Sequence, residues 1–296
     1  GLAFAQFLAG LGIITGVFFR IHILFQPNIL DIFFWTSSIY FLVRYTGSKN
    51  RRDFFGLVLC IALGWWSKYS IVFLAGAILF GLLLTRYRFL FIQAKTYLAA
   101  AFGFLIILPN LWWQYAHHWP VLHHMKELRE TQLAFVNPVD FMIDQLLLLL
   151  PVLIIWVAGL FWFFTQSIYQ VIGWIYLLVI VLLIAGSGKN YYSLGIYPVL
   201  LAGGAVAWEQ WTQSKKWIRY VLLFSIIGIT IPFLRIGLPM EEPEALTTYY
   251  EKKGYARLGL LEWEDHQNHA LPQDFADMLG WKELAEKAEL FFDKLP

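Results

Sequence analysis

The sequence contains a single cysteine, Cys60, and it lies within an apolar segment, so an intramolecular disulfide is excluded. Charged side chains are also scarce, since they make up 14% of the chain, whereas about 25% is usual in soluble domains. No internal repeat is visible, which disfavours the transporters that are built from repeated halves. These shortages argue against a soluble domain and against a small disulfide-stabilised one.

Apolar and aromatic residues dominate instead. Hydrophobic residues make up 59% of the chain and aromatic residues 19%, with 14 Trp and 26 Phe. This composition is typical of helices that contact lipid and of the aromatic belts at membrane surfaces. We therefore predict an all-α polytopic membrane protein. Nine hydrophobic segments are expected, at residues 2–20, 31–45, 54–67, 69–85, 96–113, 141–164, 170–187, 192–209 and 217–236.

The two ends of the chain differ from its middle. The chain begins at Gly1 with an apolar segment, without an initiator Met or a charged leader, so we expect its natural N-terminus to be missing. The tail is more polar, and an amphipathic helix is expected within Gln273–Leu295, with apolar residues at helical spacing at Trp281, Leu284, Ala288 and Phe291. We predict a transmembrane domain over residues 1–237 and a small external domain over residues 238–296.

Basic residues in short loops predict the orientation, because such loops stay in the cytoplasm. One set of loops is rich in them: Arg44, Lys49, Arg51, Arg52, Arg86, Arg88, Lys95, Lys215, Lys216 and Arg219. The opposite set has fewer, spread over longer stretches: Arg20, Lys68, Lys126, Arg129, Lys189 and Arg235. We therefore expect the first set to be cytoplasmic. The parts expected outside are Asp31, Lys68, the 114–140 loop, Ser187–Tyr192 and the tail.

Lys68 interrupts an apolar stretch that runs from Phe54 to Leu84. A lysine inside a membrane costs about 2.5–3.5 kcal/mol even on the gentler insertion scales, so it needs a helix end, a wet cavity or a buried anion. Two interpretations stay open. Lys68 is either a cation that binds phosphate or a turn residue that snorkels to the surface. The adjacent Trp65, Trp66 and Tyr69 suit a binding pocket as well as an interfacial turn.

Asp31 stands at the outer start of an expected helix. It is either an acidic residue favoured by the helix dipole, or a group that organises an anion site or binds a divalent cation. A histidine cluster around Trp119-Pro120 contains His117, His118, His123 and His124. Because Pro120 interrupts any single helix there and no cysteine lies nearby, we favour an interfacial stretch and predict no metal site in it.

The run Gly186–Tyr192 combines glycine amides with an ammonium group and two phenols, from Lys189, Tyr191 and Tyr192. It is not a P-loop, because the G-x-x-x-x-G-K-[ST] spacing is absent and no strand precedes it. A glycine-rich turn of this kind can still bind a phosphate group. We predict that it shares one external site with Asp31 and Lys68.

Several motifs resemble those of one family, the bacterial dolichyl-phosphate-mannose–protein mannosyltransferase-like proteins of glycosyltransferase family 39. Gly56–Tyr69 (GLVLCIALGWWSKY) is similar to a helix of that family that ends in K-Y. Phe25–Trp35 (FQPNILDIFFW) is similar to another of its segments. Three more segments resemble the family in the same order, namely Leu108–Trp113 (LPNLWW), Gly188–Pro198 (GKNYYSLGIYP) and Leu271–Trp281 (LPQDFADMLGW).

The resemblance implies a GT-C-like helical bundle in a bacterial plasma membrane, with its active site on the external face. It implies a polyprenyl-phosphate sugar as donor and a lipid, glycan or protein as acceptor. Asp31 matches the family's second acidic position, while Lys68 and Lys189 match basic positions near the donor phosphate. The family's catalytic base lies in the first external loop, which we expect upstream of residue 1. No catalytic base is therefore assigned, and the chain as given is expected to be inactive.

Two other classes of protein stay open. A transporter or flippase would place ionisable residues near the middle of several helices, whereas here they concentrate at the predicted external edge. A non-catalytic member of the same fold would keep a lipid-binding groove for an assembly role. An acidic residue in the upstream loop would favour the enzyme over that binding module.

Overall fold

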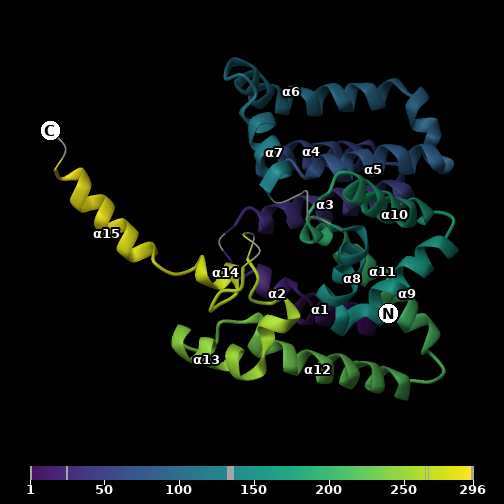
Figure 1. Ribbon diagram of the computed structural model, residues 1–296. Helices are drawn as coiled ribbons and strands as arrows, with labels where there is room; N and C mark the ends of the chain where they lie inside the picture. The colour runs from purple at the N-terminus through teal and green to yellow at the C-terminus, as the bar shows by residue number, and fades with distance from the viewer. Residues whose placement is uncertain (1, 25, 132–136, 264, 266, 295–296) are drawn as a thin grey trace. The chain divides into compact units, whose positions relative to one another are not determined.

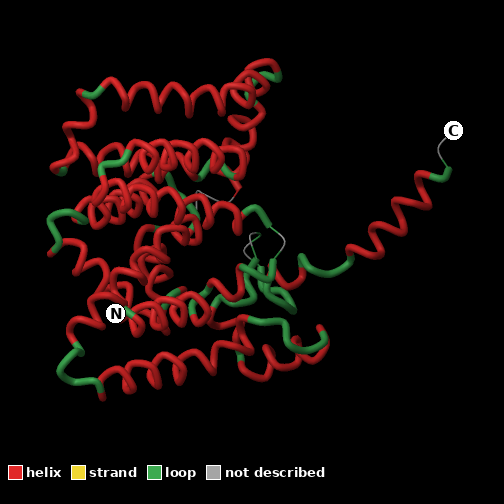
Figure 2. The backbone as a smooth tube through the Cα atoms, turned by 180° about the vertical axis from the view of Figure 1, so that it is seen from behind, coloured by secondary structure: helices red, strands yellow, loops and turns green. Residues whose placement is uncertain are grey.

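The computed structural model describes residues 2–24, 26–131, 137–263, 265 and 267–294. Phe25, Leu295 and part of the predicted 114–140 loop lie outside these residues. The regular elements of the described chain are all helices, joined by loops as Figure 2 shows, with one isolated bridge between Glu262 and Asn268 and no strand. The prediction of an all-α chain is therefore confirmed.

The α-helices are α1 (Ala3–Thr15), α2 (Phe18–Ile21), α3 (Asn28–Ser48), α4 (Arg51–Ser67), α5 (Ile71–Leu84), α6 (Ala94–Ala116), α7 (Pro120–Thr131), α8 (Pro138–Leu148), α9 (Leu153–Thr165), α10 (Gln170–Ala185), α11 (Tyr197–Trp211), α12 (Trp217–Gly237), α13 (Pro243–Lys253), α14 (Gln273–Ala276) and α15 (Trp281–Phe292). Shorter 3-10 helices are η1 (Arg86–Ile92), η3 (Leu150–Val152), η4 (Asn190–Ile196) and η5 (Tyr255–Leu258). Each predicted hydrophobic segment coincides with one or more of these elements.

Helix length and composition identify the best membrane spans. Within the described residues, α6 and α12 are each long and apolar enough to cross a membrane. Two bent pairs also qualify when taken together: α5 with η1, which bend by 106°, and α8 with Leu150–Thr165, which bend by 68°. The described residues thus contain two candidate membrane spans, or up to four if each bent pair is one span, while the crossing of all nine segments stays a prediction.

The prolines within the predicted segments differ in their effect. Pro109 and Pro232 lie inside α6 and α12, and Pro151 lies in η3 at the bend between α8 and α9. Pro198 lies within the predicted segment 192–209 but occupies the first turn of α11, where it interrupts no helix. Proline is tolerated there because the first helical N–H groups have no intrahelical partner.

The helix predicted within Gln273–Leu295 is α15, which occupies only part of that range. Gln273–Ala276 forms a separate turn, and α15 begins only at Trp281, after Gly280 in the left-handed region with φ of 80°. Glycine adopts this conformation without the clash that a side chain would cause, so it ends one element and starts another. The four apolar residues predicted from helical spacing all lie on α15.

Close helix packing holds the bundle together. In Figure 1, α6, α4 and α3 follow one another across the molecule, and α4 contacts both neighbours. Helix α5 packs mainly against α10, and α9 packs against α11. A Cβ atom at Gly159 or Gly204 would overlap the backbone of the facing helix, so these glycines allow α9 and α11 to approach closely.

The chain divides into two compact units, Gly1–Ile231 and Pro232–Pro296. The division falls inside α12. The second unit has its own small core, centred on Leu246, Tyr250 and Phe275. All predicted site residues belong to the first unit.

Candidate functional site at the junction of α3, α4 and η4

Lys68 lies where the chain leaves α4. Its backbone is extended, with φ of −158° and ψ of 133°, and its N–H donates to the carbonyl of Gly64 over 2.9 Å. The side chain turns towards the start of α3, where its Nζ donates to Asn28 Oδ1 over 2.6 Å. Asn28 in turn donates from Nδ2 to Gln26 Oε1 over 2.9 Å. The amide is therefore fixed with its oxygen facing the ammonium group.

Two tyrosine rings of η4 face the same ammonium group. Lys68 Nζ lies 4.8 Å from the ring centroid of Tyr191 and 4.4 Å from that of Tyr192. The negative face of an aromatic ring attracts a cation at this distance. These contacts join two motifs that are more than a hundred residues apart in the sequence.

Asp31 approaches from the first turn of α3 and is buried, with 5% of its surface exposed. Its Oδ1 accepts a hydrogen bond from Ser70 Oγ over 2.9 Å, which links α3 to the turn between α4 and α5. Burial lowers the pKa of Lys68 to about 8, the charge of Asp31 opposes this shift, and the charge of Lys189 adds to it. Lys68 thus interacts electrostatically with Asp31 and with Lys189, the other two charged residues of the predicted site.

Tight packing between η4 and α3 brings these residues together. Thr36 Oγ1 donates to the carbonyl of Gly195 over 3.0 Å. A Cβ atom at Gly195 would overlap the Cβ of Trp35, so only glycine fits at this contact. Because η4 also contains Tyr191 and Tyr192, this contact sets how their rings meet Lys68.

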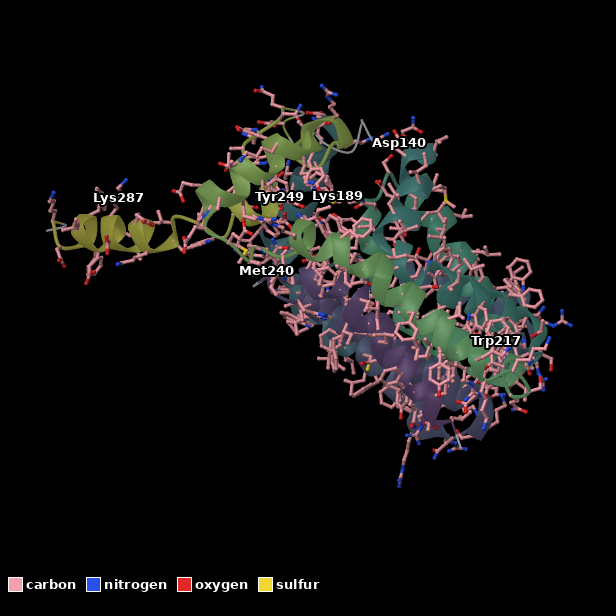
Figure 3. The ribbon with its side chains drawn as sticks, turned by 90° about the horizontal axis from the view of Figure 1, so that it is seen from below. Asp140, Lys189, Trp217, Met240, Tyr249 and Lys287 are labelled. Carbon is pink, nitrogen blue, oxygen red and sulfur yellow. The ribbon has the colours of Figure 1, made fainter. Side chains whose placement is uncertain are left out.

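The other side of η4 is fixed by α8. Asn190 Nδ2 donates to Asp144 Oδ2 over 2.9 Å, and Gln145 Nε2 donates to the carbonyl of Asn190 over 3.0 Å. Gln145 Oε1 accepts from Ser193 Oγ over 2.6 Å and from Tyr197 Oη over 2.8 Å. Figure 3 shows Lys189 and Asp140, at the start of α8, at one end of the unit and Trp217 at the opposite end.

Tyr69, the remaining predicted site residue, faces a cleft beside Lys68. The cleft has a volume of about 370 Å³ and is lined by Pro27, Asn28, Trp65, Trp66, Ser67, Lys68, Tyr69 and Asn110. Tyr69 Oη donates to Asn110 Oδ1 over 3.0 Å. The cleft therefore combines a cation, amide groups and aromatic rings.

The structure brings Lys68 together with Tyr191, Tyr192 and Asp31, while Tyr69 lines the cleft. The polar partners Asn28, Ser70, Asn110 and Asp144 were missed, because isolated polar residues form no recognisable pattern. Asn110 carried the clearest signal, as a lone amide within the apolar LPNLWW motif. No group of three or more His, Cys, Asp or Glu suited to a metal ion occurs in the described parts of the chain.

This arrangement defines a class of protein: a helical membrane protein with a cation-containing polar cleft at one end of its bundle. Residues 3–113 match the family described as dolichyl-phosphate-mannose-protein mannosyltransferase. The matched stretch runs from α1 through most of α6 and contains Asp31, Lys68 and Tyr69. No curated protein and no solved structure matches the chain significantly.

Proposed function

We propose that the protein is a membrane glycosyltransferase that takes a sugar from a polyprenyl-phosphate donor and passes it to a lipid, glycan or protein acceptor on the external face. The observation that supports this most strongly is the family match over residues 3–113, which contains the partly buried cation Lys68. A cation with an amide and two aromatic neighbours suits the phosphate of such a donor.

The chemistry requires a cation at the phosphate. An acceptor oxygen attacks the anomeric carbon, the bond from that carbon to the phosphate oxygen breaks, and the acceptor proton passes to a base. The donor phosphate is a diester with one negative charge, and it leaves as a monoester that gains a second. Lys68 would therefore stabilise the departing phosphate more than the bound donor, which is how an electrostatic group accelerates a reaction.

An apolar groove along α3 supports the lipid part of the proposal. It has a volume of about 450 Å³, and its lining comes from α1, α2, α3 and the start of α11: Ile13, Phe18, His22, Ile29, Ile32, Phe33, Thr36, Ser37, Tyr40 and Pro198. Phe33 and Tyr40 remain exposed to the surroundings. An isoprenoid chain would bury apolar surface here at about 25 cal/mol per Å².

The test replaces Lys68 by methionine, which keeps an unbranched side chain that is one atom shorter and removes the charge. Loss of a charged hydrogen bond costs about 1.5–3 kcal/mol, so we expect sugar transfer by the full-length protein to fall about ten- to hundred-fold. Lys95→Met is the matched control, because Lys95 is also a partly buried lysine near a tyrosine ring, 5.9 Å from that of Tyr45.

Transfer by the control should stay within about twofold of the parent. If folded Lys68→Met protein also transfers sugar within about twofold of the parent, Lys68 does not bind the donor phosphate. Circular dichroism and gel filtration in detergent would establish that both variants are folded.

A further inference from the structure

The cleft beside Lys68 has a wall of aromatic and amide side chains, formed by Trp65, Trp66, Tyr69 and Asn110. We propose that this wall binds the sugar ring of the donor and that it selects a neutral pyranose. The inference rests on the proposed function, because it takes Lys68 as the group that holds the donor phosphate. We call these four residues the sugar wall.

The rings of Trp65 and Tyr69 are held in place by polar contacts with α6. Trp65 Nε1 donates to Asn110 Oδ1 over 2.8 Å, alongside the bond from Tyr69. Gln114 Nε2 donates to Tyr69 Oη over 2.9 Å. The two rings also pack edge to face, with centroids 4.9 Å apart. A ring surface that is fixed before the ligand arrives loses little conformational entropy on binding.

The hydrogen bonds decide which way the Asn110 amide points. An indole N–H can only donate, so the atom that faces Trp65 must be the carbonyl oxygen of Asn110. The amide N–H groups point away from that contact, as donors for hydroxyl oxygens. A sugar ring presents such oxygens around its edge and apolar C–H groups on its faces, and therefore matches amides combined with aromatic rings.

Trp66 is anchored although it is half exposed. Its side chain is 51% exposed, while its Nε1 donates to the carbonyl of Ile106 over 3.0 Å. The indole cannot turn freely, because turning would break this bond. An exposed ring that is held at one edge offers a fixed surface to a ligand in the cleft.

The covalent structure of the donor places its sugar near this wall. In a polyprenyl-phosphate sugar the anomeric carbon is bonded directly to a phosphate oxygen, so a phosphate at Lys68 Nζ puts the ring in the adjoining space. The cleft volume of about 370 Å³ lies within the range of about 300–1,000 Å³ that is usual for small-molecule sites.

Charge limits the class of sugar. Lys68 supplies a positive charge, and none of the described residues that line the cleft is a carboxylate. Asp31 is buried against Ser70 and does not line the cleft. A protonated amino sugar in the cleft would therefore meet the charge of Lys68 with no carboxylate beside it, whereas a neutral hexose would not be repelled. We therefore expect the cleft to prefer a neutral hexose over an amino sugar.

The experiment compares two lipids with the same polyprenyl chain, polyprenyl phosphate and polyprenyl-phosphate hexose, binding to full-length protein in nanodiscs. The parent protein should bind polyprenyl-phosphate hexose more tightly than polyprenyl phosphate. Trp66→Ala should lose about three- to tenfold in affinity for the hexose lipid and leave binding of the bare phosphate lipid unchanged. Trp112→Ala is the matched control, because Trp112 is 69% exposed and does not line the cleft.

Asn110→Asp provides a second test that keeps the fold. The carboxylate oxygen still accepts from Trp65 and Tyr69, but the amide donors are lost and a negative charge is gained. Binding of the neutral hexose lipid should weaken, and the ratio of amino-sugar to hexose affinity should rise. An unchanged ratio would contradict the charge argument.

The outcomes separate the inference from the proposed function. If Trp66→Ala binds both lipids as the parent does, or if the hexose adds no affinity in the parent, the sugar does not bind at this wall. Lys68→Met would still weaken both lipids in that case, and the proposed function would stand. If Lys68→Met weakens neither lipid, the proposed function itself is wrong.

Discussion

Lys68 retains a charge in a partly buried position because partners surround it on several sides. The amide oxygen of Asn28 accepts its hydrogen bond, two tyrosine rings face it, and Asp31 supplies an opposite charge nearby. The amide and the rings are neutral, so the ammonium group keeps a net attraction for an incoming anion. A lysine paired directly with a carboxylate would attract a phosphate group only weakly, because the two protein charges would cancel.

The lowered pKa of Lys68 predicts a specific pH dependence. A phosphodiester keeps its single negative charge throughout the neutral and alkaline range, so only the protein titrates. Because the pKa of Lys68 in the free protein is about 8, donor affinity should be full below this pH and should fall as the pH rises through it. A lysine with the ordinary pKa of about 10.4 would show no such fall before about pH 9.5.

Titration of polyprenyl-phosphate hexose binding between about pH 7 and about pH 9.5 would test this prediction. Lys68→Arg is the control, because a guanidinium group stays charged over the whole range. It should give a flatter profile than the parent. A parent profile that is equally flat would show that the donor does not depend on the charge of Lys68.

Asp31 and Lys68 should act together in a double-mutant cycle. Asp31→Asn removes the charge and can keep the bond from Ser70, so a change in transfer by folded protein reports electrostatics rather than packing. Groups that share a site couple by about 0.5–3 kcal/mol, so the effect of Asp31→Asn on transfer should differ when Lys68 is already methionine. Asp31→Asn combined with Lys95→Met should be additive. Additivity in both cycles would place Asp31 outside the donor site.

At the scale of elements, the sequence predicts helices better than it predicts their ends. Apolar runs indicated the longer helices of the first unit, because burial in lipid or in the core dominates those segments. They missed α7, which lies within the predicted 114–140 loop. The predicted segment 192–209 covers two elements, since η4 precedes α11 and Pro198 lies in the first turn of that helix. Local conformation at such junctions depends on tertiary contacts, such as that between Gly195 and Trp35, which no periodicity reveals.

Replacement of Gly195 by alanine should disturb η4 as a unit. The added methyl group would overlap Trp35, so the free energy of unfolding should fall by about 1–3 kcal/mol through overpacking. Donor affinity should fall as well, because Tyr191 and Tyr192 would shift with η4. The thermal unfolding midpoint in detergent and a donor-binding assay would measure both effects.

Gly47→Ala is the matched control on α3, because a Cβ at Gly47 meets nothing within 4 Å. Alanine there should leave the midpoint unchanged or raise it slightly, since glycine weakens a helix by about 0.5–1 kcal/mol relative to alanine. If Gly195→Ala and Gly47→Ala unfold at the same temperature, the contact between η4 and α3 is not as tight as the structure indicates.

At the scale of the whole molecule, basic loops that we predict to be cytoplasmic lie close to one another. Lys49 lies over the ring of Tyr87 at 4.3 Å, and Lys95 lies near Tyr45, so the basic loops that follow α3 and α5 converge. The loop residues Lys215 and Lys216 adjoin Trp217, which lies at the opposite end from Lys189 (Figure 3). Loop charge is a local property that the sequence shows directly, whereas the side of the membrane on which each loop lies stays a prediction.

The orientation that these charges predict can be tested with two single cysteines. Asn50 and Asn268 are both exposed, and Cys60 is buried and can be replaced by serine to give an unlabelled background. Because lysine and arginine in short loops stay in the cytoplasm, Asn50→Cys should react with a membrane-impermeant maleimide only after lysis. Asn268→Cys should react in intact cells.

The Cys60→Ser protein alone should remain unlabelled, and equal labelling of both positions after lysis would show that the cysteines are equally reactive. Reaction of position 50 in intact cells would invert the topology, and the cleft at Lys68 would then face the cytoplasm, together with the donor head group that it binds.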